Sequence, residues 1–225
     1  MRVIIFGATG MVGQGVLRAC LLDPGVTQVL VIGRRPTGQQ HAKLRDVVLD
    51  DLFTVPSLGD QLNGYDACFF CLGVSAVGLK EEAYRRVTYD LTLTVAEALV
   101  ARNPGMTFIY VSGQSTDSTA QGSVMWARVK GATENAVSAL PFKATFMFRP
   151  GYIQPMHGIK SSTSWYRLLY SAVGPLYPLL RRLFPRHMTN TDAVGQAMIE
   201  VARRGAPKHI LENREINELS SSRAK

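Results

Sequence analysis

Hydrophobic residues form two alternating kinds of pattern along the chain. Short runs rich in β-branched and aromatic residues predict strands, and longer segments with apolar residues every three or four positions predict helices. The predicted strands are Arg2–Phe6, Gln28–Ile32, Asp46–Leu49, Ala67–Cys71, Thr107–Val111 and Ala144–Phe148. The predicted helices are Met11–Leu22, Glu81–Ala101, Ser123–Ala139 and Asn190–Arg204. This alternation is typical of βαβ units, so we predict an α/β fold with a doubly wound parallel sheet of the Rossmann type, covered by helices on both faces.

The regular alternation fades after Arg149-Pro150-Gly151, where a segment rich in aromatic residues, Gly and Pro continues to Pro185. A length of 225 residues suits one large α/β domain better than two independent ones. We therefore expect a single domain over residues 1–225, with residues 152–187 inserted as a small C-terminal substrate lobe. Ser220–Lys225 reads as a frayed tail.

Composition and charge narrow the choice of partners. Hydrophobic residues make up 46% of the chain and charged residues 19%, which is ordinary for a globular protein. The net charge of +8 could indicate a nucleic-acid, lipid or phosphorylated ligand. The basic residues are dispersed as doublets without a long basic run, at Arg34-Arg35, Arg85-Arg86, Arg181-Arg182 and Arg203-Arg204. We expect a small-molecule substrate and no nucleic acid, and a protein partner stays open.

The N-terminal residues bear on the compartment. Met1–Phe6 leads straight into an apolar strand, with no basic region before it, which is not the pattern of a signal peptide. Every apolar stretch is interrupted before it reaches the length of about 18 to 20 residues that a transmembrane helix needs. We therefore expect no transmembrane segment and a cytoplasmic protein.

Cysteine and histidine usage gives no sign of a disulfide framework or a metal site. The three cysteines, Cys20, Cys68 and Cys71, are an odd number and are best explained as buried thiols. Cys68 and Cys71 have redox-motif spacing, but residues three apart in a strand point to opposite faces. The four histidines form no pair at metal-ligand spacing, so no metal is predicted.

A glycine-rich turn follows the first predicted strand and precedes the first predicted helix. In Gly7-Ala8-Thr9-Gly10-Met11-Val12-Gly13, the first glycine permits a tight turn, the second lets the backbone approach a pyrophosphate, and the third allows close helix packing. The helix dipole favours the anion. We predict that this turn binds a dinucleotide, through Gly7, Thr9, Gly10, Met11, Val12 and Gly13. The alternative is a turn that is merely tight.

The end of the second strand indicates which dinucleotide is bound. Proteins selective for NAD usually place an acid there, whereas this chain has Arg34 and Arg35. Two guanidiniums can hold the 2′-phosphate of NADP, so NADP is the predicted cofactor and NAD the less favoured one; the alternative is surface charge at a strand end. Asp50, or else Asp51, could accept a hydrogen bond from the adenine amino group. Leu72, Gly73 and Pro150 complete the predicted cofactor set.

With these motifs the sequence resembles the short-chain dehydrogenase/reductase superfamily, in its atypical branch, and especially the Tat-interacting-protein-like and NAD(P)H-binding (NmrA-like) members. The resemblance covers Met1 to Arg204 and rests on the glycine turn, on Tyr110-Val111-Ser112, on Lys130 and on Arg149-Pro150-Gly151. It implies that the cofactor lies across the carboxyl edge of the sheet and that the C-terminal lobe admits the substrate.

The resemblance also implies catalytic residues, and one of them is replaced. Reductases of this family use a tyrosine as proton donor and, four residues later, a lysine that binds the nicotinamide ribose and lowers the pKa of the tyrosine. Here Lys130 is present, but Trp126 stands in the tyrosine position, and an indole has no titratable proton near neutral pH. Ser112 matches the serine that polarises the substrate oxygen.

Ser112 and Lys130 are therefore the candidate catalytic residues, and Ser115, Tyr152 and Tyr84 are the candidates to replace the missing acid. The alternative is structural, with Ser112 capping a strand and Lys130 exposed on a helix. Acyl transfer is excluded because Ser112 lacks the flanking glycines of a nucleophile elbow.

Two functions follow from this set. One is an NADP-dependent oxidoreductase or epimerase-like enzyme acting on a small organic substrate. The other is a non-catalytic NADP(H)-binding regulator that senses redox state, which the absence of the tyrosine favours.

Overall fold

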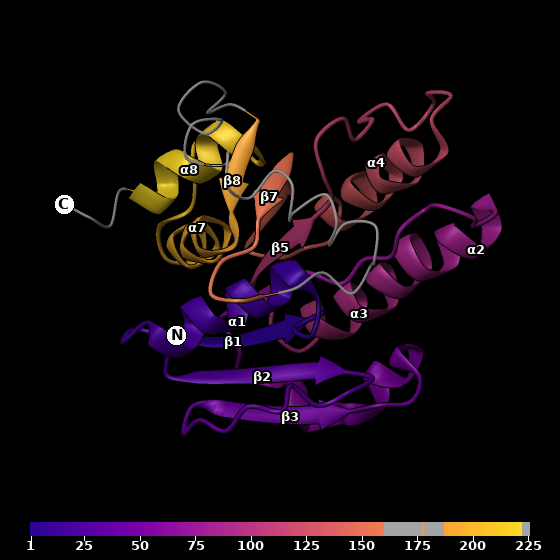
Figure 1. Cartoon of the computed structure of the whole chain (residues 1–225). Coiled ribbons are helices and arrows are strands. Elements are labelled where there is room, and N and C mark those ends of the chain that lie inside the picture. The colour runs from indigo at the N-terminus through magenta and orange to yellow at the C-terminus, as the bar shows by residue number, and fades with distance from the viewer. Residues whose placement is uncertain (160–176, 178–186, 222–225) are drawn as a thin grey trace.

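A seven-stranded parallel sheet forms the centre of the molecule (Figure 1). In this computed structural model the described residues are 1–159, 177 and 187–221. The strands of the sheet lie in the order β3-β2-β1-β4-β5-β6-β9, and two further short strands, β7 and β8, pair with each other. The order reverses between β1 and β4, so their carboxyl ends flank the point at which doubly wound sheets usually bind ligands.

Every strand of the sheet is short. The strands are β1 (Arg2–Phe6), β2 (Gln28–Gly33), β3 (Leu44–Val48), β4 (Ala67–Phe70), β5 (Thr107–Val111), β6 (Ala144–Arg149), β7 (Tyr152–Gln154), β8 (Met188–Asn190) and β9 (Ile210–Glu212). The helices are α1 (Met11–Leu22), α2 (Glu81–Arg85), α3 (Leu91–Val100), α4 (Met125–Ser138), α7 (Thr191–Arg204) and α8 (Asn213–Ser221). A 3₁₀ segment, η1, covers Leu52–Leu62, and a π-helical turn, η2, covers Arg86–Asp90.

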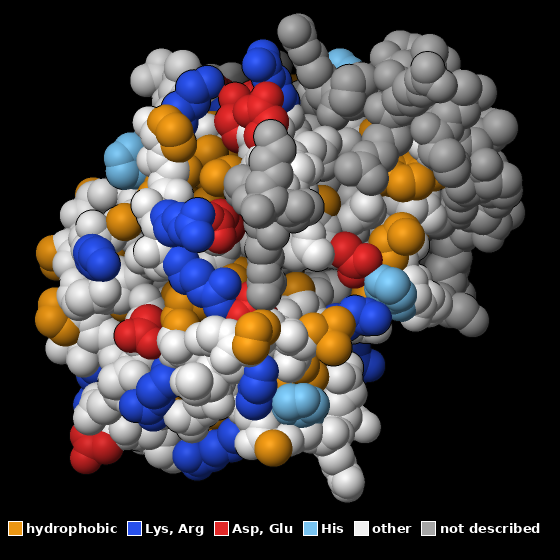
Figure 2. Space-filling model, turned by 90° about the vertical axis from the view of Figure 1, so that its left-hand side faces the viewer, with side chains coloured by type: hydrophobic (Ala, Val, Ile, Leu, Met, Phe, Trp, Pro, Cys, Tyr) orange, Lys and Arg blue, Asp and Glu red, His pale blue; other side chains and the backbone are white. Residues whose placement is uncertain are grey.

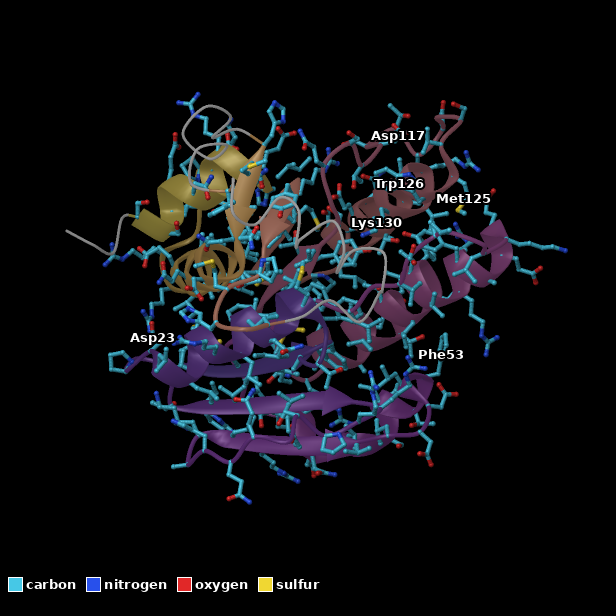
Figure 3. The ribbon with its side chains drawn as sticks, in the orientation of Figure 1. Asp23, Phe53, Asp117, Met125, Trp126 and Lys130 are labelled. Carbon is cyan, nitrogen blue, oxygen red and sulfur yellow. The ribbon has the colours of Figure 1, made fainter. Side chains whose placement is uncertain are left out.

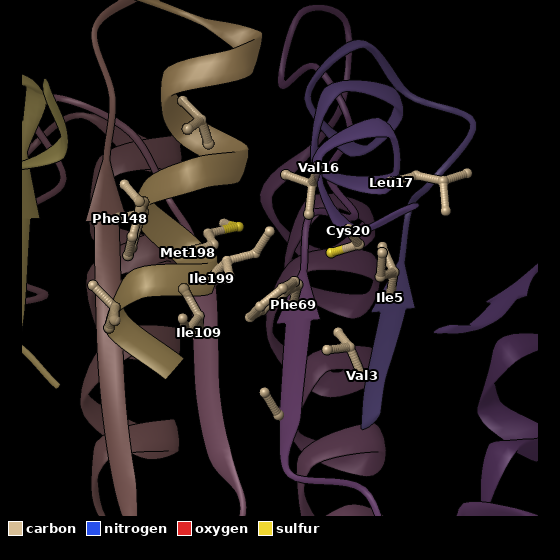
Figure 4. Packing of buried hydrophobic residues seen from close by; sticks show 14 of the residues in the cluster. Val3, Ile5, Val16, Leu17, Cys20, Phe69, Ile109, Phe148, Met198 and Ile199 are labelled. Carbon is tan, nitrogen blue, oxygen red and sulfur yellow. The ribbon is translucent and has the colours of Figure 1, made fainter. Parts of the chain in front are cut away.

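The strands are buried on both faces, which explains why they read as continuous apolar runs. In β1, Val3 and Ile5 pack on one face, in a cluster that includes residues of α1, α7 and α8. Ile4 and Phe6 pack on the other face with residues of α3, α4 and η1. Figure 4 shows the first cluster, where α1 and α7 lie side by side over the sheet. The predicted doubly wound α/β fold is confirmed.

Most of the predicted elements are present with shifted ends. The helix predicted over Glu81–Ala101 is α2, η2 and α3 in direct succession. The third strand begins at Leu44 rather than Asp46, and α4 begins at Met125 rather than Ser123. The strands β7, β8 and β9 were not predicted, because three residues carry too little periodicity to recognise. The helix α8 was also missed, and it includes Ser220 and Ser221, which were expected in a frayed tail.

The predicted C-terminal lobe, residues 152–187, lies mostly outside the described residues. Its described boundaries are informative, because β7 and β8 pair in parallel with Tyr152 opposite Met188 and Gln154 opposite Asn190. Asn190 then caps α7, since its side chain accepts a hydrogen bond from the backbone N–H of Ala193 at 2.7 Å. The pairing of β7 with β8 therefore brings the two ends of this segment side by side.

The surface and the helices carry two further findings. On the face of Figure 2, Lys and Arg side chains lie in several small groups separated by acidic, apolar and uncharged side chains. Within the described residues, no helix combines the length and the apolar character that crossing a bilayer requires.

Two glycines bring α1 and α7 into close contact. A β-carbon added at Gly15 of α1 would lie 2.5 Å from the β-carbon of Thr191 and 2.8 Å from its carbonyl oxygen. A β-carbon at Gly195 of α7 would lie 2.7 Å from the β-carbon of Ala19. Since helix backbones do not yield easily, only glycine fits at both positions. The first helix is thus held on the sheet by a helix from the far end of the chain.

The Gly15→Ala variant should therefore be less stable, by about 1 to 3 kcal/mol, because the added methyl group collides with the start of α7. Gly105→Ala is the control, since a β-carbon there meets nothing within 4 Å. Urea unfolding followed by circular dichroism measures both. Equal midpoints for the two variants would show that the helices can separate without cost.

Candidate functional site

A cleft lies at the carboxyl ends of β1, β2 and β4, where the order of the strands reverses. Its volume is about 330 Å³. Seven of the residues predicted to bind the cofactor line it together: Gly7, Thr9, Gly10, Arg34, Arg35, Leu72 and Gly73. The structure therefore brings the glycine turn, the arginine pair and the end of β4 into one site.

The glycines of the turn have different roles. Gly7 has a φ of +79°, and a β-carbon there would lie 2.6 Å from the backbone nitrogen of Leu72. A β-carbon at Gly13 would lie 2.1 Å from the Gly7 carbonyl oxygen, so these two glycines hold the turn against β4 and against α1. A β-carbon at Gly10 would meet only the same oxygen, at 3.3 Å. Gly10 therefore lines an open cradle, and the packing of the fold does not by itself require a glycine there.

The amino end of α1 faces this cradle. Gly10 precedes the first turn of the helix, which contains Met11, Val12 and Gly13 and has no acidic residue. No side chain caps the helix at Gly10. A phosphate here would accept hydrogen bonds from the backbone N–H groups of the first helical turn and would be stabilised by the positive end of the helix dipole. The residues present therefore fit a pyrophosphate.

Arg34 and Arg35 extend the cleft beyond β2. Both are exposed, and neither has an ion-pair partner among the described residues. The loop that follows is anchored by Thr37, whose N–H and hydroxyl both donate to a carboxylate oxygen of Asp46, at 3.0 Å and 2.7 Å. The loop after the arginine pair is therefore anchored, and the two exposed guanidiniums beside the cleft are available to an anion.

The acid predicted to bind the adenine is not in the cleft. Asp50 is exposed and does not line the cleft. The carboxylate of Asp51 accepts a hydrogen bond from the N–H of Phe53 at 3.0 Å and so begins η1. Leu52, which follows them, lines the cleft instead. The other lining residues absent from the sequence prediction are Ala8, Val31, Gly33, Cys71, Val74 and Ser75. The signal for Ala8, Gly33, Cys71 and Val74 is positional, because each adjoins a predicted residue, whereas Val31 and Ser75 have no such signal.

The two candidate catalytic residues are in contact. The Lys130 ammonium on α4 donates to the backbone carbonyl of Ser112, just after β5. The Ser112 hydroxyl donates to the carbonyl of Phe148 at 3.2 Å and is buried. Burial lowers the pKa of Lys130 to about 8, although the negative charge of Glu134 opposes this shift. Lys130 is therefore not the freely solvated helix lysine of the structural alternative.

A buried ion pair lies one helical turn beyond Lys130. The Arg149 guanidinium at the end of β6 donates to both carboxylate oxygens of Glu134 on α4, one of them at 3.0 Å, and to the hydroxyl of Ser118 at 2.6 Å. Both charged side chains are at most 10% exposed. Because an unpaired buried charge would be costly, this pair fixes α4 to β6 and so fixes the position of Lys130. Pro150, the next residue, is buried and does not line the cleft.

Trp126 lies one turn before Lys130 on α4 and is partly buried (Figure 3). Of the candidates to replace the missing tyrosine, Tyr84 is only 1% exposed, so a substrate could not reach it. The hydroxyl of Tyr152 donates to Gln154 at 2.8 Å, and burial raises its pKa. Ser115 is exposed, with a φ of +67°. No phenol occupies the position of the family's acid.

The cysteines behave as buried thiols. Cys68 packs on one face of the sheet, and Cys71 packs against the cluster on the other face, as the strand period predicts. Burial raises the pKa of Cys71 to about 12, so its sulfur is uncharged where it lines the cleft. Cys68 and Cys71 are therefore not arranged as a redox pair.

Comparison with known proteins also indicates a dinucleotide-binding protein. The sequence model of the NAD dependent epimerase/dehydratase family matches residues 3–122. The protein fmp52 of Emericella nidulans is 29% identical over 206 residues, 88% of this chain and 85% of that protein. The protein fmp52-1 of Aspergillus terreus is 33% identical over 157 residues, 67% of this chain and 66% of that protein. The enzyme WbmF of Bordetella bronchiseptica, solved with NAD⁺, has a TM-score of 0.65 at 15% identity, covering 98% of this chain and 77% of that one.

These relatives correct the expected location. Both fungal proteins are named mitochondrial, so the expectation of a cytoplasmic protein is wrong. The inference failed because the patterns on which it was based do not distinguish the cytoplasm from an organelle.

The matched segment, residues 3–122, covers more than half of the 225 residues and contains the glycine turn, the arginine pair, the end of β4 and Ser112. Lys130 and Trp126 lie beyond it. On this match the chain is a member of the NAD dependent epimerase/dehydratase family, with the Rossmann fold of the short-chain dehydrogenases.

Proposed function

We propose that this chain is an NADP-dependent oxidoreductase or epimerase-like enzyme that acts on a small organic substrate. The observation that carries the proposal is the position of Arg34 and Arg35, which line the same cleft as the glycine turn and have no ion-pair partner in the described part of the chain. Two guanidiniums favour a 2′-phosphate, which an acid at this place would repel. We assign the cofactor to Gly7, Thr9, Gly10, Arg34, Arg35, Leu72 and Gly73, with Met11, Val12 and Gly13 in the first helical turn.

The reaction would take place beyond the cleft, near Ser112 and Lys130. When bound, NADPH supplies a hydride to a carbonyl carbon, and the substrate oxygen then needs a proton. We assign Lys130 to the cofactor ribose and Ser112 to the substrate oxygen. A hydroxyl has one hydrogen, so Ser112 must release the carbonyl of Phe148 when it donates to the substrate. Residues 152–187 are proposed to admit the substrate, since β7 and β8 bring both ends of this segment together.

A second candidate function is a non-catalytic NADP(H)-binding regulator. Trp126 favours it, because the residue at the usual place of the acid cannot donate a proton. Both functions need the cofactor, and only the first needs the residues beyond the cleft.

The first prediction concerns the choice of cofactor. We expect NADP(H) to bind at least about tenfold tighter than NAD(H), and the Arg34→Ala/Arg35→Ala variant to lose this preference, because the preference comes from the 2′-phosphate. Titration calorimetry measures both affinities. Arg45→Ala/Arg85→Ala is the control, since it removes two exposed positive charges that do not line the cleft. Equal affinities of the wild type for NADP(H) and NAD(H) would overturn the assignment.

The second prediction concerns the cradle. Gly10→Val should weaken binding of NADP(H) by about a hundredfold or more, because the side chain fills the space that the pyrophosphate approaches. Its circular dichroism and unfolding midpoint should stay close to those of the wild type, since a β-carbon there meets only one oxygen, at 3.3 Å. Gly13→Ala should instead damage the fold itself, with a β-carbon 2.1 Å from the Gly7 oxygen. Folded Gly10→Val protein with normal affinity would place the dinucleotide elsewhere.

The third prediction separates the two functions. Trp126→Tyr places a phenol one turn before Lys130, whose positive charge would lower the pKa of the phenol. If the chain is an enzyme that has lost its acid, NADPH-dependent reduction of a panel of carbonyl compounds should rise by about 10² to 10⁴, the usual effect of a positioned acid. Trp126→Phe is the control without a hydroxyl. A Trp126→Tyr protein that binds NADPH normally but reduces nothing faster than Trp126→Phe would favour the regulator.

A further inference from the structure

Exposed apolar side chains gather at one place on the described surface. Seven large hydrophobic side chains are exposed among the described residues, and four of them, Val74, Val77, Leu79 and Val124, lie on two segments. Val77 is the most exposed, at 86%. Val74, Val77 and Leu79 belong to the segment between β4 and α2, and Val124 directly precedes α4. We call these four residues the apolar rim.

The apolar rim continues the wall of the cofactor cleft. Val74 belongs to both, since it lines the cleft next to Leu72 and Gly73 and is also exposed. In Figure 1, α2 and α4 both begin at the end of the molecule towards which the strands point. A molecule placed beside the end of the cleft would therefore meet the apolar rim next.

The two segments of the rim are tied together. Arg128 on α4 forms an ion pair with Glu81 at the start of α2, at 2.7 Å, and donates to the carbonyl of Gly122 at 2.5 Å. The carboxylate of Asp117 accepts hydrogen bonds from the N–H groups of Gly122, at 2.6 Å, and Gln121, at 3.1 Å. The segment before Val124 is thus anchored to α2. The backbone that carries Val124 is therefore anchored rather than part of a free loop.

The charges around the rim do not suit a diphosphate. Three cations, Lys80, Arg85 and Arg128, and three acids, Glu81, Glu82 and Asp117, lie on or next to the segments that carry the rim. The guanidinium of Arg128 is already paired, and the first turn of α2 carries both glutamates, which offset the positive end of its dipole. A nucleotide sugar would bring two phosphates into surroundings that have no excess of positive charge. An uncharged, apolar group fits it better.

Trp126 is an aromatic residue close to the apolar rim in the sequence. It lies two residues after Val124 and one helical turn before Lys130, and it offers an aromatic surface where the family has a phenol. Monomeric proteins rarely leave apolar side chains grouped on the surface without a ligand or partner. The apolar rim adjoins the cleft at Val74, and Trp126 follows Val124 on α4.

We infer that the substrate is a hydrophobic carbonyl compound or the corresponding alcohol, with its polar end near Ser112 and Lys130 and its apolar group on Val74, Val77, Leu79 and Val124. The inference rests on the proposed function, because it names the substrate class of that site. It sets this chain apart from an enzyme for nucleotide sugars.

The test uses a series of ketones from butan-2-one to decan-2-one, titrated into protein saturated with NADP⁺, so that no turnover occurs. Affinity should rise about two- to fourfold for each added methylene, as for groups that become partly or fully buried. In Val77→Ser/Val124→Ser the preference for decan-2-one over butan-2-one should fall at least fivefold. Leu22→Ser/Val48→Ser, which alters two exposed apolar residues elsewhere, should leave it unchanged.

The binding of NADP⁺ is measured first and separately. If NADP⁺ does not bind, the proposed function fails, and the ketones titrated without cofactor still report on the rim. An affinity independent of chain length, or tighter binding of UDP-glucose than of decan-2-one, would overturn the inference. So would a rim variant that changes only the self-association seen in sedimentation, because the rim would then cover a second copy of the chain.

Discussion

The candidate site depends on how closely three backbone segments approach one another. The turn after β1 lies against the end of β4, and the start of α1 lies against the turn, at separations that leave no room for a β-carbon at Gly7 or Gly13. This contact places the open end of α1 beside the end of β4, and the cleft is the space that remains. The fold therefore builds the phosphate-binding part of the site from backbone atoms, which a change of surface side chains does not disturb.

The reaction half of the site is built in another way. Lys130 depends on side chains, because the buried pair of Glu134 and Arg149 joins α4 to β6, and the ammonium contacts the carbonyl of Ser112. Side chains can be exchanged one at a time without loss of the fold. Trp126 is such an exchange, since it stands on an intact helix beside an intact lysine. This difference explains why the cofactor-binding residues identify the family, whereas the reaction must be determined by experiment.

The same difference decides what could be predicted from sequence. Strands such as β1 and β5 are apolar throughout because both their faces are buried, and the glycine turn has a fixed place after the first strand, so the fold and most of the cleft could be predicted. The sequence placed Asp50, or else Asp51, at the adenine, but Asp51 caps η1 and Leu52 lines the cleft. Which residue after β3 lines the cleft depends on how that segment lies against the other strands, and no local pattern gives this. The pairing of β7 with β8 joins residues about 36 positions apart, and no local pattern encodes it.

The contact between α1 and α7 has a consequence for the order of folding. Gly15 and Thr191 are separated by 176 residues (191 − 15), so their contact is among the long-range ones that slow folding. At ribosomal rates of about 5 to 20 residues per second, the first helix waits on the order of ten seconds for its partner. During that time the outer face of α1 has nothing to pack against. The helix α1 is therefore synthesised early but reaches its final packing only after α7 has been synthesised.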